Sequence, residues 1–310
     1  MLAESLSVLD SVRLNFSQGG LLIMNITLAF IMFGVALEIN LSSFKSIILK
    51  PKSVITGIIS QFFLLPFVTY ILVLILQPTP AVALGMILVA ACPGGNISNF
   101  ISSLAKGNIE LSVSLTGFAT PGAIFMRPIN FTFWGGLYVK SHPLLRPIEI
   151  DPFQIFQTIF IILGIPLIIG MLFSKKFPVL SEKIKNPIKI SSIFIFMGYV
   201  VAALSLNLDH FLKYIHLIIF IVLAHNALAL LTGFTVSSIF KLPRKNRRSI
   251  TIETGIQNSG LGLVLIFNPK LFPPDLELGG MAFIAAWWGV WHIIAGLGLA
   301  FLWAKKPLEE

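Results

Sequence analysis

The chain has 310 residues, of which 56% are hydrophobic and only 11% are charged, whereas an ordinary soluble domain carries about 25% charged residues. A water-soluble fold cannot bury that much apolar surface, so the composition excludes an ordinary soluble domain. The formal net charge of +9 raises the question of nucleic-acid binding, which the distribution of the basic residues answers.

Apolar runs recur from Leu21 to Trp303 with only short polar segments between them. Several runs approach or exceed the roughly 20 residues that an α-helix needs to cross about 30 Å of hydrocarbon. They predict nine membrane-spanning helices, at about 21–39, 54–76, 82–105, 109–135, 152–173, 190–207, 214–240, 249–268 and 280–304. We therefore expect an all-α integral membrane protein with one membrane domain over 21–304, an exposed or interfacial N-terminal tail at 1–20 and a C-terminal tail at 305–310.

The 22 Lys and Arg residues are unevenly distributed between the loops. With the N-terminus outside, sixteen fall in inner loops, five in outer segments and one, Arg127, inside a span. Cytoplasmic loops of membrane proteins carry such an excess. We expect a multi-pass protein of the cell (inner or plasma) membrane, with its N-terminus outside and its C-terminus cytoplasmic. Nucleic acid is not an expected partner, because the basic residues report orientation.

Two of the predicted spans contain residues that break a helix. In the third, Pro93 lacks an N–H and is followed by Gly94 and Gly95, and glycine makes helix propagation costly. The eighth holds two glycines and an ionisable carboxylate, Glu253. In hydrocarbon such interruptions are tolerated only where they are buried in protein or line a wet cavity. Interrupted helices in corresponding halves of a chain indicate the binding site of an inverted-repeat secondary transporter.

Oxygen-bearing side chains cluster around these breaks, and a hard cation prefers oxygen ligands. Ser112 and Thr116 are four residues apart, so their hydroxyls share one helical face, and the hairpin at Lys106-Gly107 can bring that face back to Ser98 and Asn99. Hydroxyls also serve helix packing or bond to their own backbone. Their concentration beside a broken helix favours an ion site over that alternative.

Glu253 is the residue that the sequence singles out most strongly. An ionised carboxylate at the membrane centre costs about 2.5–3.5 kcal/mol or more and marks a functional site. The alternative is a protonated glutamate that hydrogen-bonds to a neighbour. On the seventh span, His225 and Asn226 are expected to form hydrogen bonds to another helix.

Three motifs together resemble the bile acid:sodium symporter family. They are Pro93-Gly94-Gly95-Asn96-Ile97-Ser98-Asn99, then Lys106-Gly107-Asn108 with Leu111-Ser112-Val113, and finally Glu253-Thr254-Gly255-Ile256-Gln257-Asn258. The resemblance extends from about Phe33 to Trp303. It implies a nine-helix member that lacks the first helix of ten-helix relatives. It also implies an inverted-repeat fold in which a core (spans within about 54–135 and 214–304) lies against a panel (about 21–39 and 152–207) and two broken helices cross.

The same resemblance implies a sodium-coupled symporter of an organic anion, bile acid-like or a small carboxylate, which works by alternating access and is not an enzyme. It assigns two sites for Na⁺. The first sodium site consists of Ser98, Asn99, Ser112, Thr116 and Glu253. The second consists of Gln61, Glu253 and Gln257 with the carbonyls of Thr254 and Ile256.

Four residues are candidate contacts for the organic anion: Asn96, Asn258, His292 and Arg127. As an alternative, both asparagines could cap the half-helices. His292 is followed by Ile293, where many relatives of the family have asparagine. This difference weakens the argument for an anion contact at this position. Arg127 precedes Pro128 in the outer half of the fourth span. Its alternative is snorkelling to the outer interface.

Other functional classes find less support. A carrier in which Glu253 binds a proton in place of sodium remains an alternative hypothesis. An intramembrane enzyme is less favoured, because the chain has no His-Glu-x-x-His motif and no pair of aspartates inside its predicted spans. A phosphate-binding Gly-x-x-x-x-Gly-Lys loop is also absent from the sequence, which argues against ATP-driven pumping. The single cysteine, Cys92, rules out an internal disulfide.

Overall fold

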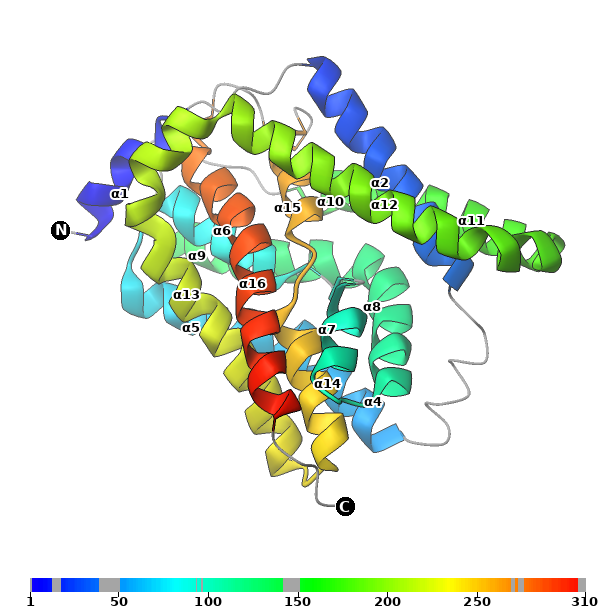
Figure 1. Ribbon diagram of the computed structural model, residues 1–310. Coiled ribbons are helices and arrows are strands. Elements are labelled where there is room, and N and C mark those ends of the chain that lie inside the picture. Colours follow the sequence, from blue (N-terminus) through cyan, green and yellow to red (C-terminus); the bar gives the residue numbers. More distant parts are fainter. Residues whose placement is uncertain are drawn as a thin grey trace.

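The computed structural model describes residues 2–12, 18–38, 51–92, 94–95, 97–141, 151–268, 271–272 and 276–305. Within these residues every regular element is a helix, as expected, and the one β-type contact is an isolated bridge (Figure 1). Five helical segments are each long and apolar enough to cross a membrane: Pro51–Leu76, Ile109–Ser141, Pro152–Lys176, Leu208–Ile239 and Gly279–Ala304.

Each predicted span overlaps a helix or a run of consecutive helices in the described chain. The first four correspond to α2 (Gln18–Glu38), then α4 (Pro51–Ile59), η1 (Ser60–Leu64) and α5 (Leu65–Leu76), then α6 (Pro80–Ala90) and α7 (Ile97–Leu104), then α8 (Ile109–Asn130), η2 (Phe131–Gly135) and α9 (Gly136–Ser141). The others correspond to α10 (Pro152–Ile159), η3 (Phe160–Gly164) and α11 (Ile165–Lys176), then α12 (Pro178–Leu206), α13 (Leu208–Ile239), α14 (Arg244–Gly255) with α15 (Ser259–Ile266), and α16 (Gly279–Ala304). Within the described residues, non-helical segments interrupt the third and eighth spans alone, in the positions that their glycines predict.

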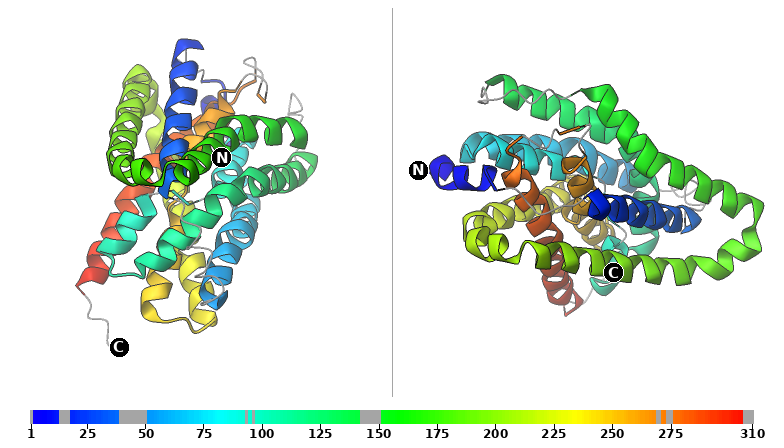
Figure 2. Two further views of the ribbon diagram at one scale, coloured as in Figure 1. Left: turned by 90° about the vertical axis from the view of Figure 1, so that its right-hand side faces the viewer. Right: turned by 90° about the horizontal axis from the view of Figure 1, so that it is seen from above.

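The helices form two groups. In one, α2 packs against α11 and α12, and small residues permit a close approach, because the Gly34 backbone lies against Ile188 and the Gly170 backbone against Ala36. In the other, α13 packs on α14 and α16, while α16 also packs on α6 and α15. Figure 2 shows α2 and α12 towards the top of the left-hand view, with the second group below them.

Proline removes backbone donors inside these helices, and the structure replaces one of the lost bonds. Pro66 cannot donate to the carbonyl of Phe62, one turn earlier, and η1 is a wide π-helical turn just before it. The Asn130 side-chain amide, from the end of α8, donates to that Phe62 carbonyl at 2.9 Å. A freed carbonyl inside the membrane is thereby paired, and α8 is tied to the second span.

Most side chains of the N-terminal segment are exposed, but one face of it packs on the protein. Residues Leu2–Asp10 form helix α1, and Leu6 and Leu9 are fully buried against α6, α13 and α16. The two leucines are three residues apart, so they share one helical face. A nine-residue polar-and-apolar segment carries no membrane-span signal, and its packing depends on contacts that are distant in sequence.

Asp10 ends α1 beside the first residues of two other helices. Thr79, which precedes α6, donates a hydrogen bond to the Asp10 carboxyl at 3.0 Å, and the backbone of Gly280 at the start of α16 lies close to the same group. Burial raises the pKa of Asp10 from 3.8 to about 7; the hydrogen bond from Thr79 opposes this rise and the charge of Glu277 adds to it.

We predict that Asp10 makes folding stability depend on pH. Because the folded-state pKa is raised, Asp10 stabilises the fold fully below about pH 3.8, and this contribution is lost as the pH rises through about 7. Asp10→Asn keeps a neutral acceptor for Thr79, so thermal unfolding in detergent should depend less on pH than in the wild type, with the variant relatively more stable above neutrality. The matched control is Asp209→Asn, which removes an exposed carboxylate at the start of α13. Equal pH profiles for the wild type and Asp10→Asn would contradict the assignment.

Candidate ion-binding site at the crossing of the broken helices

The two interrupted spans meet at their breaks. Gly94, between α6 and α7, forms an antiparallel bridge with Gln257, between α14 and α15. The Gly95 N–H donates to the carbonyl of Ile256 at 3.1 Å. Each break therefore supplies hydrogen-bond partners for the other, as backbone in hydrocarbon requires. Pro93 and Asn96 lie outside the described residues, so their predicted roles stay predictions.

Glu253 lies just before the break in the eighth span and is fully buried. Its carboxylate accepts hydrogen bonds from the hydroxyls of Ser98 on α7, at 2.6 Å, and of Ser112 on α8. Thr116, one turn further along α8, donates at 3.2 Å to the other carboxylate oxygen. Two helices thus direct three hydroxyls at one carboxylate. The four-residue spacing of Ser112 and Thr116 predicts that these two hydroxyls share a helical face.

The oxygens around Glu253 outnumber the protons available to join them. Ser112 has one hydroxyl proton, yet its oxygen lies 2.8 Å from Asn99 Oδ1 and 3.2 Å from Ser102 Oγ in addition to its contact with Glu253. Thr116 is likewise 3.2 Å from Asn99 Oδ1. Carboxylate, amide and hydroxyl oxygens crowded in this way suit a hard cation.

Ser102 is a member of this cluster that the sequence reading missed. It is fully buried on α7, and its hydroxyl meets Ser112. The sequence could have indicated Ser102, because it follows Ser98 by four residues and both hydroxyls therefore lie on one face of a helix. The resemblance to a known family did not draw attention to it.

A second group of oxygens lies on the other side of Glu253. Gln61, in the π-helical turn η1, and Gln257 are both buried. Gln257 donates through Nε2 to the carbonyl of Thr254 at 2.7 Å, while its Oε1 finds no hydrogen-bond partner among the described residues. A Cβ added at Gly94 would lie 2.9 Å from Glu253 Oε2 and 3.6 Å from Gln61 Oε1. The buried, unpartnered Gln257 oxygen fits an additional cation ligand.

A polar network at the α7–α8 hairpin holds these helices in place. Asn108 caps α8, because its Oδ1 accepts from the Leu111 N–H at 3.1 Å, and its Nδ2 donates to Asn246 Oδ1 at 2.9 Å. Asn246 donates in turn to Ser53 Oγ at 2.8 Å, on α4. Arg248 donates to the carbonyl of Ala105 at 2.8 Å. The α7–α8 hairpin is thereby fixed against α14, which sets the distance between Ser112 and Glu253.

The seventh span supports the crossing from outside it. Asn226 donates to the carbonyl of Gly255, the last residue of α14, at 2.8 Å. His225 Nε2 and Thr69 Oγ1 are 2.8 Å apart. The predicted hydrogen bonds from His225 and Asn226 to other helices are therefore present, and the bond from Asn226 satisfies a carbonyl freed by the break.

The candidate anion contacts lie in different surroundings. Asn258 precedes α15 but makes no side-chain cap bond there, so the capping alternative does not account for it. His292 is buried on α16 between Gly289, which lies against Ser259, and Gly296, which lies against Ile256. The three positions share a face of α16, so His292 is next to the crossing.

Arg127 is fully buried on α8, and none of its three guanidinium nitrogens has a hydrogen-bond partner among the described residues. The Cys92 thiol, just before the break in the third span, is close enough to interact with it electrostatically. Snorkelling would leave the guanidinium exposed, so the structure does not support that alternative. Arg127 is eleven residues after Thr116, which puts both on one face, about 16 Å apart along the helix.

Comparison with known proteins agrees with these features. A model of the Sodium Bile acid symporter family matches residues 25–214. The sodium-dependent transporter YocS of Bacillus subtilis is 32% identical over 92% of this chain and 84% of its own length. The human ileal sodium/bile acid cotransporter is 27% identical over 86% of this chain and 78% of its own.

A probable chloroplastic sodium/metabolite cotransporter of rice, BASS1, is 27% identical over 91% of this chain and 66% of its own length. The family match covers more than half of the chain, and the bacterial relative is similar over nearly all of it. This chain is therefore a multi-pass membrane protein of the sodium/bile acid symporter family, whose members are sodium-coupled transporters and not enzymes.

Proposed function

We propose that the protein imports an organic anion together with sodium by alternating access, with two sodium sites that share Glu253. The observation that carries the proposal is the burial of this carboxylate among hydroxyl and amide oxygens at the crossing of two broken helices. An ionised carboxylate in that position needs a positive partner. No Lys or Arg forms an ion pair with it among the described residues, so a cation from solution fills that role.

The first proposed sodium site comprises the oxygens of Ser98, Asn99, Ser112, Thr116 and Glu253. Ser102 is within hydrogen-bonding distance of Ser112 and adds a further hydroxyl. A cation at this point would bind the oxygens that now compete for the single Ser112 proton. It would also hold α7, α8 and α14 together, so sodium would stabilise the crossing.

The second proposed site comprises Gln61, Glu253, Gln257 and the carbonyls of Thr254 and Ile256. The Ile256 carbonyl already accepts from Gly95, and the Thr254 carbonyl from Gln257, but each carbonyl oxygen has a second lone pair. Gln61 belongs to the second span, and the other ligands belong to the eighth. Sodium here would join the η1 turn to the break beyond α14.

The proposed anion site lies beside the crossing and includes Arg127. A buried guanidinium without a partner is costly, and it is adapted to carboxylates through two parallel hydrogen bonds. An acidic group on the substrate would supply that partner. Asn258 and His292 are the further proposed contacts, and Asn96 remains a proposed contact outside the described residues. The names of the relatives include both bile acid and metabolite cotransporters, so bile acid-like anions and small carboxylates are both candidates.

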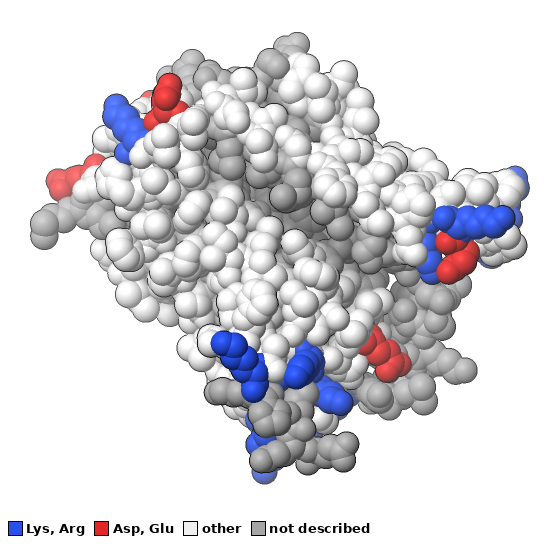
Figure 3. Space-filling view, viewed as in Figure 1, with Lys and Arg blue, Asp and Glu red and all other residues white. Residues whose placement is uncertain are grey.

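The proposed orientation places the N-terminus outside the cell membrane and the C-terminus in the cytoplasm. Figure 3 shows most of the visible Lys and Arg at the lower edge and at the right-hand end, with acidic side chains at the right-hand end, the lower right and the upper left, and a broad uncharged band between these regions. This distribution supports the inner side at the lower right. In the same proposal α2 and α10–α12 form the panel, and the helices that carry the ion ligands form the core that moves against it.

Glu253→Gln should abolish sodium binding and sodium-stimulated uptake. The variant keeps one acceptor oxygen but removes the negative charge that offsets two cations where Coulomb interactions are strong. Linkage requires sodium and substrate to tighten each other by the same factor, typically about 5–150-fold, and Glu253→Gln should lose both effects in calorimetry. Ser112→Ala and Thr116→Ala should weaken sodium binding less, because each removes one neutral ligand.

Glu110→Gln is the matched control, since it neutralises an exposed glutamate in the first turn of α8. Uptake driven by a proton gradient without sodium would favour the proton-coupled alternative. Sodium-dependent substrate binding that persists in Glu253→Gln would show that the ion sites lie elsewhere.

Gly94→Ala and Gly95→Ala form a second matched pair. The new methyl group at Gly94 would lie 2.9 Å from Glu253 Oε2 and 3.2 Å from the Glu253 carbonyl, whereas at Gly95 the nearest atom is Asn258 Cβ at 3.9 Å. Overpacking of this kind costs about 1–3 kcal/mol, so Gly94→Ala should raise the sodium concentration for half-maximal uptake roughly tenfold. Gly95→Ala should leave the sodium dependence near that of the wild type. Equal sodium dependence in both variants would place the ions away from Gly94.

Arg127→Met should stabilise the empty protein and impair transport. Replacing a buried charge by an apolar side chain of similar length should raise the free energy of unfolding by about 1–4 kcal/mol, measured as a higher Tm without substrate. Loss of a charge-assisted pair costs at least about 2 kcal/mol, so the apparent KM for the anion should rise roughly 30-fold. Arg127→Lys keeps the charge, so its Tm and its apparent KM should lie between those of the wild type and Arg127→Met. A wild-type KM in Arg127→Met would exclude contact with the substrate.

A further inference from the structure

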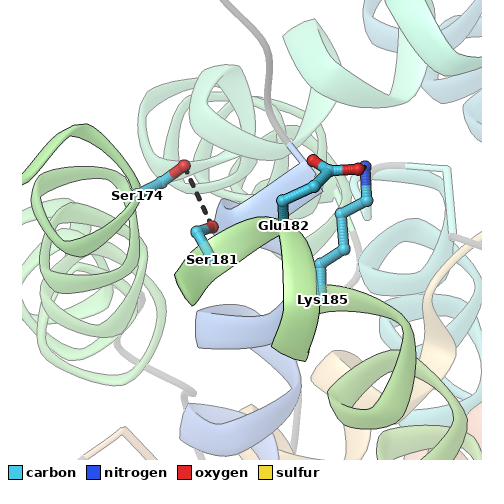
Figure 4. Close-up of polar contacts among 4 residues, drawn as sticks. All are labelled: Ser174, Ser181, Glu182 and Lys185. Carbon is cyan, nitrogen blue, oxygen red and sulfur yellow. Dashed lines mark hydrogen bonds and ion pairs between the residues drawn. The ribbon is translucent and has the colours of Figure 1, made fainter. Parts of the chain in front are cut away.

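The turn between α11 and α12 carries a concentration of lysines at one end of the panel. Residues 174–189 contain five lysines and one acid: Lys175, Lys176, Lys183, Lys185, Lys189 and Glu182. Lys175, Lys176 and Lys183 are exposed. Glu182 pairs with Lys185 at 2.6 Å (Figure 4), so the acid is engaged with a lysine other than these three.

The turn itself is held in one shape. Ser181 on α12 and Ser174 on α11 are joined by a hydrogen bond of 3.2 Å, which Figure 4 shows between the two helices. The Phe177 N–H donates to the Phe173 carbonyl at 2.8 Å, and the Ser181 N–H donates to the Phe177 carbonyl at 2.9 Å. The ends of both helices, with their lysines, therefore have fixed positions relative to each other.

On α12, Lys183 belongs to the face that is turned away from the protein. Val179, Lys183, Ile190 and Phe194 recur at helical spacing, and all four are exposed, with Val179 and Phe194 at 71% and 72%. The opposite face packs on α2, where Ile188 meets Gly34. In a membrane protein the exposed apolar face contacts lipid, so Lys183 is directed towards lipid and not towards another helix.

The exposed face of α11 ends in the same way. Ile165, Ile169 and Leu172 are exposed at helical spacing. The next position in that series is Lys176, with Lys175 beside it. The Lys176 amine lies 5.5 Å from the centre of the Phe177 ring. Two lipid-facing stripes, one on each helix, therefore carry lysines near the same turn.

The length of α12 places this turn at the level of the lipid headgroups. Its 29 residues span about 43 Å, more than the roughly 30 Å of hydrocarbon. The helix begins about twelve residues before the apolar run that predicts the sixth span. This first part contains Glu182, Lys183 and Lys185, which cannot lie among acyl chains at low cost. It extends into the region that headgroup phosphates occupy.

We propose that the α11–α12 turn is a binding site for anionic phospholipid. The amines of Lys175, Lys176 and Lys183 would contact the headgroup, and the acyl chains would lie along the apolar stripes that lead away from them. Lysines next to a membrane attract anionic lipid, and the exposed Val179 and Leu180 give the turn an apolar contact with the interface. Lipid held there would anchor the panel while the core moves.

The test compares two triple variants of the full chain in nanodiscs. One removes the turn lysines, Lys175→Gln, Lys176→Gln and Lys183→Gln; the other removes three exposed lysines elsewhere on the inner side, Lys52→Gln, Lys245→Gln and Lys305→Gln. The Tm is measured in phosphatidylcholine alone and with an increasing fraction of phosphatidylglycerol. The wild type and the second triple should gain thermal stability with phosphatidylglycerol, and the first triple should lose most of that gain.

Two outcomes would overturn the proposal. If the wild type gains no stability from phosphatidylglycerol, or if both triples lose the gain equally, the turn is not a specific lipid site. A triple Lys→Arg variant at the turn keeps the charge and should keep the gain, and a matching Tm in phosphatidylcholine alone verifies that each variant folds. Because unfolding is measured rather than uptake, the result does not depend on the transported anion or on the sodium sites.

Discussion

The buried carboxylate of Glu253 is the constraint on which the rest of the structure depends. Removing its charge from water is costly, and hydrogen bonds from Ser98, Ser112 and Thr116 offset only part of that cost. To bring those hydroxyls to one point, α7 must start near the membrane centre and α8 must return beside it. The break in the third span and the short hairpin after α7 satisfy both requirements. The bonds from Asn108, Asn246 and Arg248 then hold the hairpin in register with α14.

Breaking helices inside a membrane exposes polar backbone, and this chain pairs the exposed groups with one another. Gly95 donates to Ile256, and Asn226 donates to Gly255. Asn130 serves the Phe62 carbonyl that Pro66 leaves without a donor. These bonds come from three different spans. Backbone groups left unpaired within one helix thus form hydrogen bonds to another helix. The irregular backbone is therefore compatible with a membrane interior.

Much of this architecture could be predicted from the sequence, because the signals are local. Apolar runs indicate spans, and proline with glycine indicates where two of them break. The four-residue spacing of Ser112 and Thr116 fixes their common face. Which residues meet across the protein is a different question. The contact of Asn130 with Phe62, the burial of Leu6 and Leu9, and the position of Ser102 beside Ser112 depend on helix packing. Periodicity in a uniformly apolar helix does not indicate which face meets protein and which meets lipid.

The same limit explains why neither the burial of Arg127 nor the full length of α12 could be predicted from the sequence. A cation near the end of a predicted span is compatible with snorkelling until packing shows that its side chain is buried. Residues 178–189 are too polar to be recognised as part of a span, yet Pro178 suits the first turn of a helix and the segment contains helix-forming lysines. The helix therefore extends well beyond its apolar part.

Pro121 lies within the part of α8 that separates Thr116 from Arg127. That proline cannot donate to the Gly117 carbonyl, and the Thr120 hydroxyl bonds to the carbonyl of Thr116 at 2.9 Å, two features that bend helices. The joint lies between the ion ligands and the buried guanidinium. Bending at Pro121 would move Arg127 while Ser112 and Thr116 stay against Glu253. If Glu253 and Arg127 hold the ions and the anion as proposed, a bend at Pro121 would change the distance between the two cargoes without disturbing the ion ligands.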